Sequence, residues 1–126
     1  MILEISVKEK QKNIYMIELG GYLDSSTYIE LKDRIASILV ASTKGIIFDL
    51  ENLIYISSAG MGVIFQARRF MDESKGAFIM TNLQPQIEKA FQIMEAWPGD
   101  VVIKSRKEID NYLDFMQRKE IKKRSM

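Results

Sequence analysis

The chain has 126 residues, of which 47% are hydrophobic and 28% are charged, and its formal net charge at pH 7 is +1. This length and composition are typical of one globular domain, and a net charge so close to zero gives no reason to expect nucleic acid as a partner. Cysteine and histidine are both absent, which excludes disulfides, thiolate nucleophiles, imidazole bases and the usual zinc ligands. No apolar run reaches the roughly 18 residues that span a bilayer, and the N-terminus lacks the basic segment of a signal peptide. We therefore expect a cytoplasmic protein without a metal ion or cofactor.

The N-terminal residues predict a β-hairpin. Apolar and polar residues alternate over residues 3–8, which is the two-residue period of a half-buried strand. Residues 10–13 indicate a turn, and residues 14–19 form a second strand that ends at Gly20 and Gly21.

A helix is expected to open within residues 24–27. Thr27 and Glu30 have the spacing of a capping box, although Ser25 or Ser26 would serve equally well as the cap. The apolar stripe of this helix consists of Tyr28, Leu31, Ile35, Ile38 and Leu39.

The middle of the chain predicts a buried strand, a short polar turn and a strongly amphipathic helix. Residues 46–50 are the strand, and the helix begins after Ser58 and ends at residues 74–76. A short strand follows at residues 77–80. The stripe of the helix is Val63, Ile64, Ala67, Phe70 and Met71.

The last third predicts a helix from Pro85 to residues 97–99, a strand at residues 101–103, and a final helix. We expect one domain over residues 1–117 and a basic tail over residues 118–126 that frays. The expected fold is α/β: an N-terminal hairpin within a mixed, largely parallel five-stranded sheet, flanked by about four helices. Apolar residues of the last two helices are Ile87, Ala90, Phe91 and Met94, then Ile109, Tyr112, Leu113 and Met116.

Enzyme chemistry has little support. The chain has no Gly-x-Ser-x-Gly motif and no histidine, and the pair Gly60 and Gly62 lacks the spacing of a nucleotide-binding loop. Asp24, Asp49 and Glu51 are better explained as turn and strand-end residues than as an acid pair. We interpret the basic C-terminal cluster as a solvated helix end, because helix C-termini favour cations.

Two adjacent serines, Ser57 and Ser58, stand where the amphipathic helix begins. A helix start leaves backbone N–H groups without partners, so a serine there either caps the helix or carries a phosphate that the helix end stabilises. Ala59 and Gly60 are small and leave the backbone accessible to another molecule. Both interpretations of the serine pair stay open at this point.

The flank of the same helix suggests a binding surface. Met61 and Phe65 lie one turn apart beside the core stripe, and Arg68 and Asp72 border them. They form either an apolar patch for a partner or the margin of the core.

Two motifs resemble those of STAS domains. Residues 21–24 with Thr27 and Leu31 resemble the Gly-x-Leu-Asp…Leu signature, and residues 49–62 resemble the strand, phosphorylation loop and helix of that family. The chain is similar to bacterial anti-sigma factor antagonists, over about residues 3–104.

The resemblance implies a partner-switching mechanism that regulates transcription. An unphosphorylated antagonist binds an anti-sigma factor that is also a serine kinase and thereby frees a sigma factor; phosphorylation releases the antagonist, and a metal-dependent serine phosphatase resets it. The implied acceptor is Ser58, with Ser57 as the alternative, because Ser57 replaces the Asp that many antagonists have before the acceptor. The alternative function is a constitutive STAS scaffold or adaptor subunit, in a signalling or lipid-trafficking complex, without a phospho-switch. We expect a monomer or weak dimer whose partner-binding residues are Asp24, Ser57, Ser58, Ala59, Gly60, Met61, Phe65 and Arg68.

Overall fold

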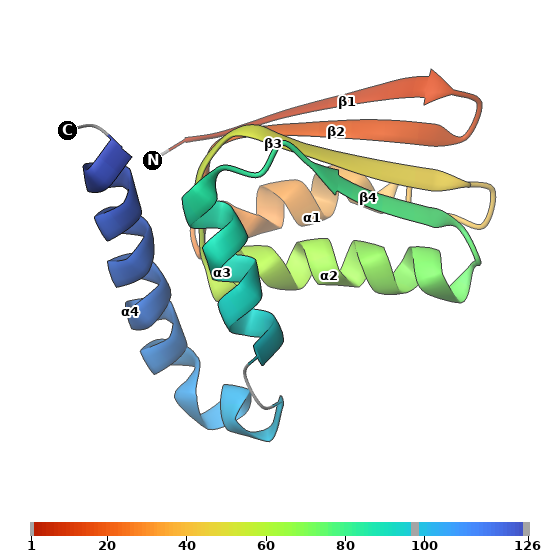
Figure 1. Cartoon of the computed structure of the whole chain (residues 1–126). Coiled ribbons are helices and arrows are strands. Elements are labelled where there is room, and N and C mark those ends of the chain that lie inside the picture. Colours follow the sequence, from red (N-terminus) through yellow and green to blue (C-terminus); the bar gives the residue numbers. More distant parts are fainter. Residues whose placement is uncertain (1, 97–98, 125–126) are drawn as a thin grey trace.

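The structure is a computed structural model that describes residues 2–96 and 99–124, with side chains for residues 2–95 and 110–123. Figure 1 shows the sheet lying above two helices, with the last two helices gathered at one end. In chain order the elements are β1 (Leu3–Gln11), β2 (Ile14–Leu23), α1 (Tyr28–Ala36), β3 (Gly45–Ile56), α2 (Ser58–Glu73), β4 (Ala77–Thr81), α3 (Pro85–Ala96) and α4 (Gly99–Arg124).

The four strands form one mixed sheet in the order β1-β2-β3-β4. β1 and β2 pair antiparallel, which confirms the predicted hairpin, and its turn includes Asn13 with φ 66°. β2 with β3 and β3 with β4 pair in parallel, so the sheet is mixed and largely parallel as predicted.

The predicted fifth strand is wrong. Residues 101–103 belong to α4, which runs from Gly99 to Arg124, and the sheet of the described residues has four strands. Three apolar residues are too short a run to distinguish a strand from a helix by pattern. The residues that follow are good helix formers, so one continuous helix replaces the expected strand and helix.

β3 is longer than predicted. The expected polar turn after residue 50 is instead strand, and β3 continues to Ile56. Its register against β2 shifts between Glu18 and Gly20 and again between Gly21 and Tyr22, which accommodates extra residues in β3. The polar side chains of this stretch are exposed at these bulges, so a polar sequence did not require a turn.

The core lies between the sheet and the helices. α1 and α2 run side by side beneath one face of the sheet (Figure 1). The opposite face is partly polar, and on it Lys8 of β1 pairs with Glu18 of β2 at 2.8 Å. The largest fully buried side chains are Ile17, Leu19, Leu23, Leu31, Ile35, Ile46, Phe48, Leu50, Leu53, Ile56, Met61 and Ile64.

α4 packs against the end of β3 through buried contacts. The Gln117 side chain accepts a hydrogen bond from the Ile56 amide (2.8 Å) and donates one to the Ile56 carbonyl (2.7 Å). Leu113 is completely buried. Residues 118–124 continue this helix, and Glu120 lies 3.4 Å from Lys89 of α3. The boundary at residue 117 stays a prediction.

Within the described ranges, no helix is long and apolar enough to cross a membrane.

Candidate functional site

Ser57 is the cap of α2. Its backbone is extended (φ −100°, ψ 173°), and its Oγ accepts a hydrogen bond from the Gly60 amide at 3.3 Å. The Ser57 amide donates to the Leu23 carbonyl at 2.9 Å, which ties the start of α2 to the end of β2. The cap interpretation therefore holds for Ser57, and its hydroxyl is already in use.

Ser58 is the first residue of α2 and has no such role. Its side chain is 4% exposed, and its Oγ has no hydrogen-bond partner among the described residues. Its amide donates to Oδ1 of Asp110, on α4, at 2.9 Å. A carboxylate from the C-terminal helix thus occupies the positive end of α2.

Gly60 and Gly62 differ in their surroundings. A Cβ on Gly60 would lie 2.6 Å from Leu23 Cγ and 2.8 Å from the Leu23 carbonyl oxygen, so only glycine lets α2 approach β2 this closely. A Cβ on Gly62 would meet nothing within 4 Å. Packing explains the first glycine, and Gly62 leaves the surface of α2 open.

Asp24 lies in the loop before α1 and organises it. Its Oδ1 accepts hydrogen bonds from the amide and the hydroxyl of Ser26, at 2.9 and 2.7 Å. Burial raises the pKa of Asp24, but the hydrogen bonds from Ser26 and Thr27 outweigh it, so the pKa lies below its ordinary value.

The expected capping box at Thr27 and Glu30 is wrong. The Thr27 side chain makes no cap hydrogen bond to α1. Its Oγ1 instead accepts from the Asp24 amide at 2.9 Å and donates to the Tyr22 carbonyl at 2.8 Å. Thr27 is buried, and it closes the loop that holds Asp24 near Ser57.

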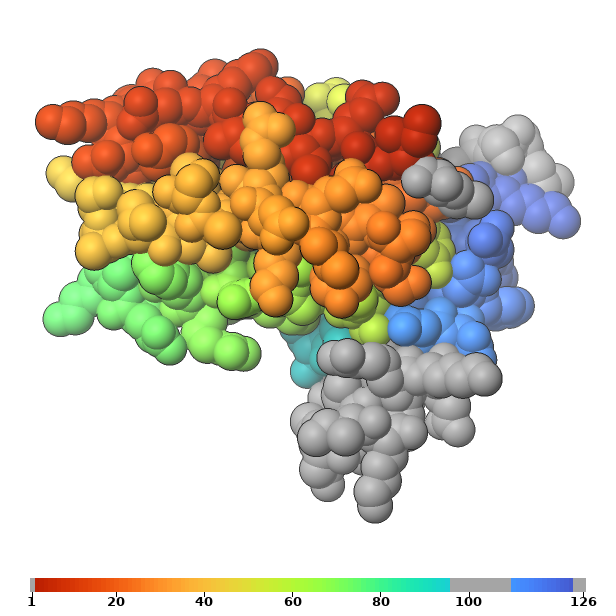
Figure 2. All heavy atoms as spheres, turned by 180° about the vertical axis from the view of Figure 1, so that it is seen from behind, coloured from red at the N-terminus to blue at the C-terminus, as the bar shows by residue number. Residues whose placement is uncertain are grey.

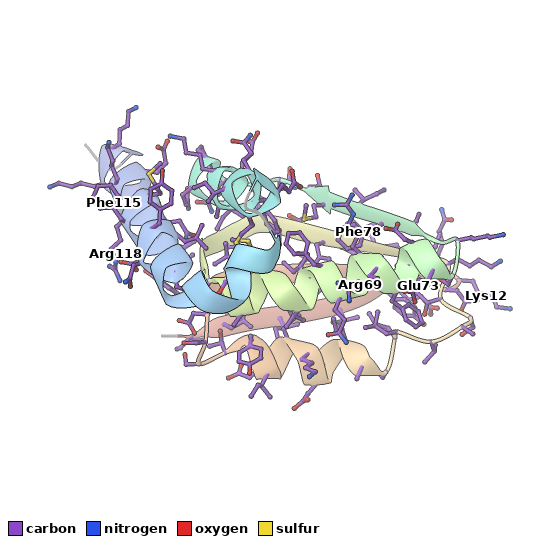
Figure 3. The ribbon with its side chains drawn as sticks, turned by 90° about the horizontal axis from the view of Figure 1, so that it is seen from below. Lys12, Arg69, Glu73, Phe78, Phe115 and Arg118 are labelled. Carbon is purple, nitrogen blue, oxygen red and sulfur yellow. The ribbon has the colours of Figure 1, made fainter. Side chains whose placement is uncertain are left out.

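A cleft of about 280 Å³ separates this loop from α4. The rings of Tyr22 and Tyr55 stack at 5.7 Å along it. Burial, with the charge and hydrogen bond of Asp114, raises the pKa of Tyr55 to about 12. The lining residues are Tyr22, Asp24, Ser25, Tyr55, Ser57, Asp110, Asp114 and Arg118. Phe115 and Arg118 mark α4 in Figure 3, at the opposite end of the molecule from Lys12.

A second hollow, of about 200 Å³, lies between α1 and α2. Figure 2 shows this face, with α1 in orange against the green side chains of α2. We call it the α1–α2 groove. Its lining residues are Tyr28, Lys32, Ser58, Ala59, Gly62, Val63 and Gln66.

The flank of α2 that carries Met61, Phe65 and Arg68 is only partly exposed. Met61 is completely buried in the core, so it offers no surface to a partner in this conformation. Phe65 is half-buried because Phe91 of α3 packs on it edge-on at 5.6 Å. Arg68 is exposed. Sequence spacing gave the correct helix face but did not show that α3 covers part of it.

Among the residues with described side chains, no group of three carboxylate, imidazole or thiol side chains is placed to hold a metal ion. Of the predicted site residues, Asp24 and Ser57 line the cleft beside α4, Ser58 and Ala59 line the α1–α2 groove, and Gly60 packs against Leu23. Sequence reasoning missed Asp110, Asp114 and Gln117, because a contact across 52 residues leaves no local pattern.

The fold and the site together define a class of protein: a small α/β domain with a pair of serines at the start of a helix. The family profile of the STAS domain matches residues 6–98, and the chain therefore belongs to the STAS domain family.

Several relatives carry a named function. The anti-sigma-B factor antagonist of Staphylococcus aureus is 25% identical over 83 residues, covering 66% of this chain and 77% of that protein. BtrV of Bordetella bronchiseptica is 27% identical over 75 residues, covering 60% of this chain and 65% of BtrV, slightly less than two thirds of its length.

Solved structures share the fold. The anti-sigma factor antagonist SpoIIAA in its unphosphorylated form superposes with a TM-score of 0.66 at 20% identity, covering 83% of this chain and 96% of that chain. The phosphorylated form of the Bacillus protein SpoIIAA gives a TM-score of 0.63, also at 20% identity, covering 80% and 97%. At these identities the similarity establishes the fold.

Proposed function

We propose that this protein is an anti-sigma factor antagonist whose binding to an anti-sigma factor is switched off by phosphorylation of Ser58. The observation that carries the proposal is the position of Ser58, which is the first residue of α2 and lines the α1–α2 groove. Membership of the STAS family and relatives named as antagonists support the choice of partner class. The protein would act as a cytoplasmic binding module without enzymatic activity.

Ser58 is the better acceptor of the two serines. The Ser57 hydroxyl already caps α2 by accepting a hydrogen bond from the Gly60 amide, so modifying it would disturb that bond. The Ser58 hydroxyl makes no hydrogen bond to any described residue, so modifying it breaks no such bond. Either phosphate would lie at a helix N-terminus, which favours negative charge.

The α1–α2 groove is the surface that we assign to the partner. Gly62 leaves α2 open there, and Tyr28 and Lys32 border it from α1. A phosphate brings a charge of about −1.5 to −2 to the edge of this groove, and an unpaired charge in an interface costs several kcal/mol of binding. The switch therefore requires no unfolding of the domain.

The test is a phosphorylation assay with a purified anti-sigma factor kinase from the same organism. The kinase, ATP and Mg²⁺ are incubated with the protein and with its Ser57→Ala and Ser58→Ala variants, and phosphate is located by mass spectrometry. We expect phosphate on the parent and on Ser57→Ala, none on Ser58→Ala, and weaker kinase binding after phosphorylation. Removal of the phosphate by a metal-dependent serine phosphatase should restore binding. Phosphate on Ser57, or on neither serine, contradicts the proposal.

One observation favours the alternative function, a constitutive STAS scaffold or adaptor. Ser58 is only 4% exposed and its hydroxyl is buried, so a kinase has no direct access to the hydroxyl in this conformation. A scaffold would bind its partner with the same affinity whether or not ATP is present. Calorimetric titration of the partner before and after incubation with kinase separates the two functions.

A further inference from the structure

The C-terminal helix contacts the serine that the proposed switch would modify. Figure 1 shows α4 at the end of the molecule where α2 begins. The Ser58 amide donates to Asp110 of α4 at 2.9 Å, and the Ser58 hydroxyl is buried without a partner among the described residues. A hydroxyl sealed in this way cannot reach the phosphate of ATP in a kinase active site. Transfer to Ser58 requires an open state in which α4 has moved.

Asp110 occupies the place that a phosphate on Ser58 would need. The first amides of a helix are an anion site, and one of them is already bound to the Asp110 carboxylate. Two anions cannot share this site without repulsion. A phosphorylated Ser58 therefore competes with Asp110 for the N-terminus of α2.

The surrounding charges increase this competition. Asp24, Asp110 and Asp114 line the cleft beside the start of α2, whereas Ser58 lines the α1–α2 groove, so this cleft adds negative charge near Ser58 without enclosing it. Arg118 is the cation lining the same cleft, and its Nε is hydrogen-bonded to Asp114 at 2.9 Å. The negative charge near Ser58 thus opposes a phosphate while α4 stays in place.

Specific side-chain contacts hold the described part of α4 in place. Gln117 bonds both backbone groups of Ile56, and Leu113 is completely buried. Lys89 of α3 adds an exposed ion pair with Glu120, a type of contact that contributes little.

We propose that α4 is a latch over Ser58: it shields the serine from the kinase while closed, and phosphorylation expels it by displacing Asp110 from the N-terminus of α2. The latch rests on the proposed function, since it assumes that Ser58 is the phosphate acceptor. Its consequence is that the kinase acts only on the open fraction of molecules, so the strength of the α4 contacts sets the phosphorylation rate. Once added, the phosphate keeps the latch open until a phosphatase removes it.

The closed latch is tested by thiol accessibility. The chain has no cysteine, so Ser58→Cys creates a single thiol whose reaction with Ellman's reagent reports exposure at this position. Gln117→Ala in the Ser58→Cys background weakens the latch without changing the charge beside the thiol. Asn111→Ala is the matched control, because Asn111 is exposed on the same helix.

We expect the thiol to react slowly in Ser58→Cys and in the Asn111→Ala control, and about tenfold faster with Gln117→Ala, because losing a buried hydrogen-bond partner favours the open state by about that factor. Reaction at the rate of a free thiol in all three proteins would overturn the latch, as would equal rates for Gln117→Ala and Asn111→Ala.

The expulsion of α4 is tested with phosphoserine placed at position 58 during translation, which requires no kinase. Hydrogen exchange of residues 110–123 is compared with that of β2 and β3. We expect faster exchange in α4 by about tenfold or more and unchanged protection in the sheet. Unchanged exchange in α4, or lost protection in α4 and the sheet together, refutes the latch. Neither experiment contains a partner, so failure of the partner-binding assay refutes the proposed function independently of these results.

Discussion

Gly60 and Gly62 of α2 offer a matched test of how closely the site is packed. Both lie in the same helix, two residues apart, and alanine increases helix stability at each by up to about 1 kcal/mol. At Gly60 the new methyl group would lie 2.6 Å from Leu23 Cγ and 2.8 Å from the Leu23 carbonyl oxygen. Carbon atoms normally pack at about 3.5–4.0 Å, so β2 and α2 must separate by a sizeable fraction of an ångström.

The size of the effect follows from these distances. Overpacking of this kind costs about 1–3 kcal/mol, which exceeds or cancels the helix gain. At Gly62 there is nothing within 4 Å, so only the gain remains. We therefore expect Gly62→Ala to stabilise the protein by about 1 kcal/mol and Gly60→Ala to be less stable than Gly62→Ala by about 1–3 kcal/mol.

Urea unfolding followed by far-UV circular dichroism measures both free energies, and equal slopes show that the comparison is valid. Separation of α2 from β2 should also weaken the hydrogen bond from the Ser57 amide to the Leu23 carbonyl. Amide exchange of Ser57 should thus quicken in Gly60→Ala alone. If Gly60→Ala proves as stable as Gly62→Ala, the close approach of α2 to β2 is not a constraint on the site.

Three other outcomes follow from the same contacts. Ser57→Ala should lower the free energy of unfolding by about 1 kcal/mol because it removes the cap, whereas Ser58→Ala should leave it unchanged or slightly higher; thermal unfolding distinguishes them. Gly62→Arg should abolish binding of the anti-sigma factor in calorimetry yet change stability by less than about 0.5 kcal/mol, while Glu73→Arg, at the far end of α2 (Figure 3), should leave binding intact; equal affinities would place the partner elsewhere. The lowered pKa of Asp24 means that its contribution to stability is present above about pH 4 and is lost as the pH falls through the folded pKa, so acid unfolding of Asp24→Asn should show a smaller loss over that range.

Much of the fold could be predicted from local patterns. The hairpin, the helix after Ser58 and the largely parallel sheet follow from apolar periodicity, which depends only on neighbouring residues. The prediction of a strand at residues 101–103 was wrong because a short apolar pattern is compatible with both a helix and a strand. The prediction of a polar turn after residue 50 was wrong because bulges let the strand β3 carry exposed polar side chains.

The candidate site was predictable only in part, for a related reason. The serine pair and its small neighbours are consecutive, so sequence alone located them. The burial of Met61 and the covering of Phe65 depend on α3, and the contact of Ser58 depends on α4, which joins it from 52 residues away. Tertiary contacts of this kind decide which residues a partner can reach, and no spacing rule encodes them.

The contact between Asp110 and Ser58 also bears on Ser57, which stands where many anti-sigma factor antagonists have Asp. The resemblance to anti-sigma factor antagonists led us to expect a carboxylate directly before the acceptor, where this chain has Ser57. In the structure Ser57 caps α2 through its hydroxyl, and a carboxylate reaches the same helix end from Asp110. Because a negative charge at a helix N-terminus stabilises it by about 0.3–1 kcal/mol wherever it comes from, the carboxylate is relocated rather than lost. A carboxylate fixed in the loop would stay beside the serine in every state, whereas one carried on α4 leaves when that helix moves, and in the proposed latch this difference is what would let α4 respond to a phosphate on Ser58.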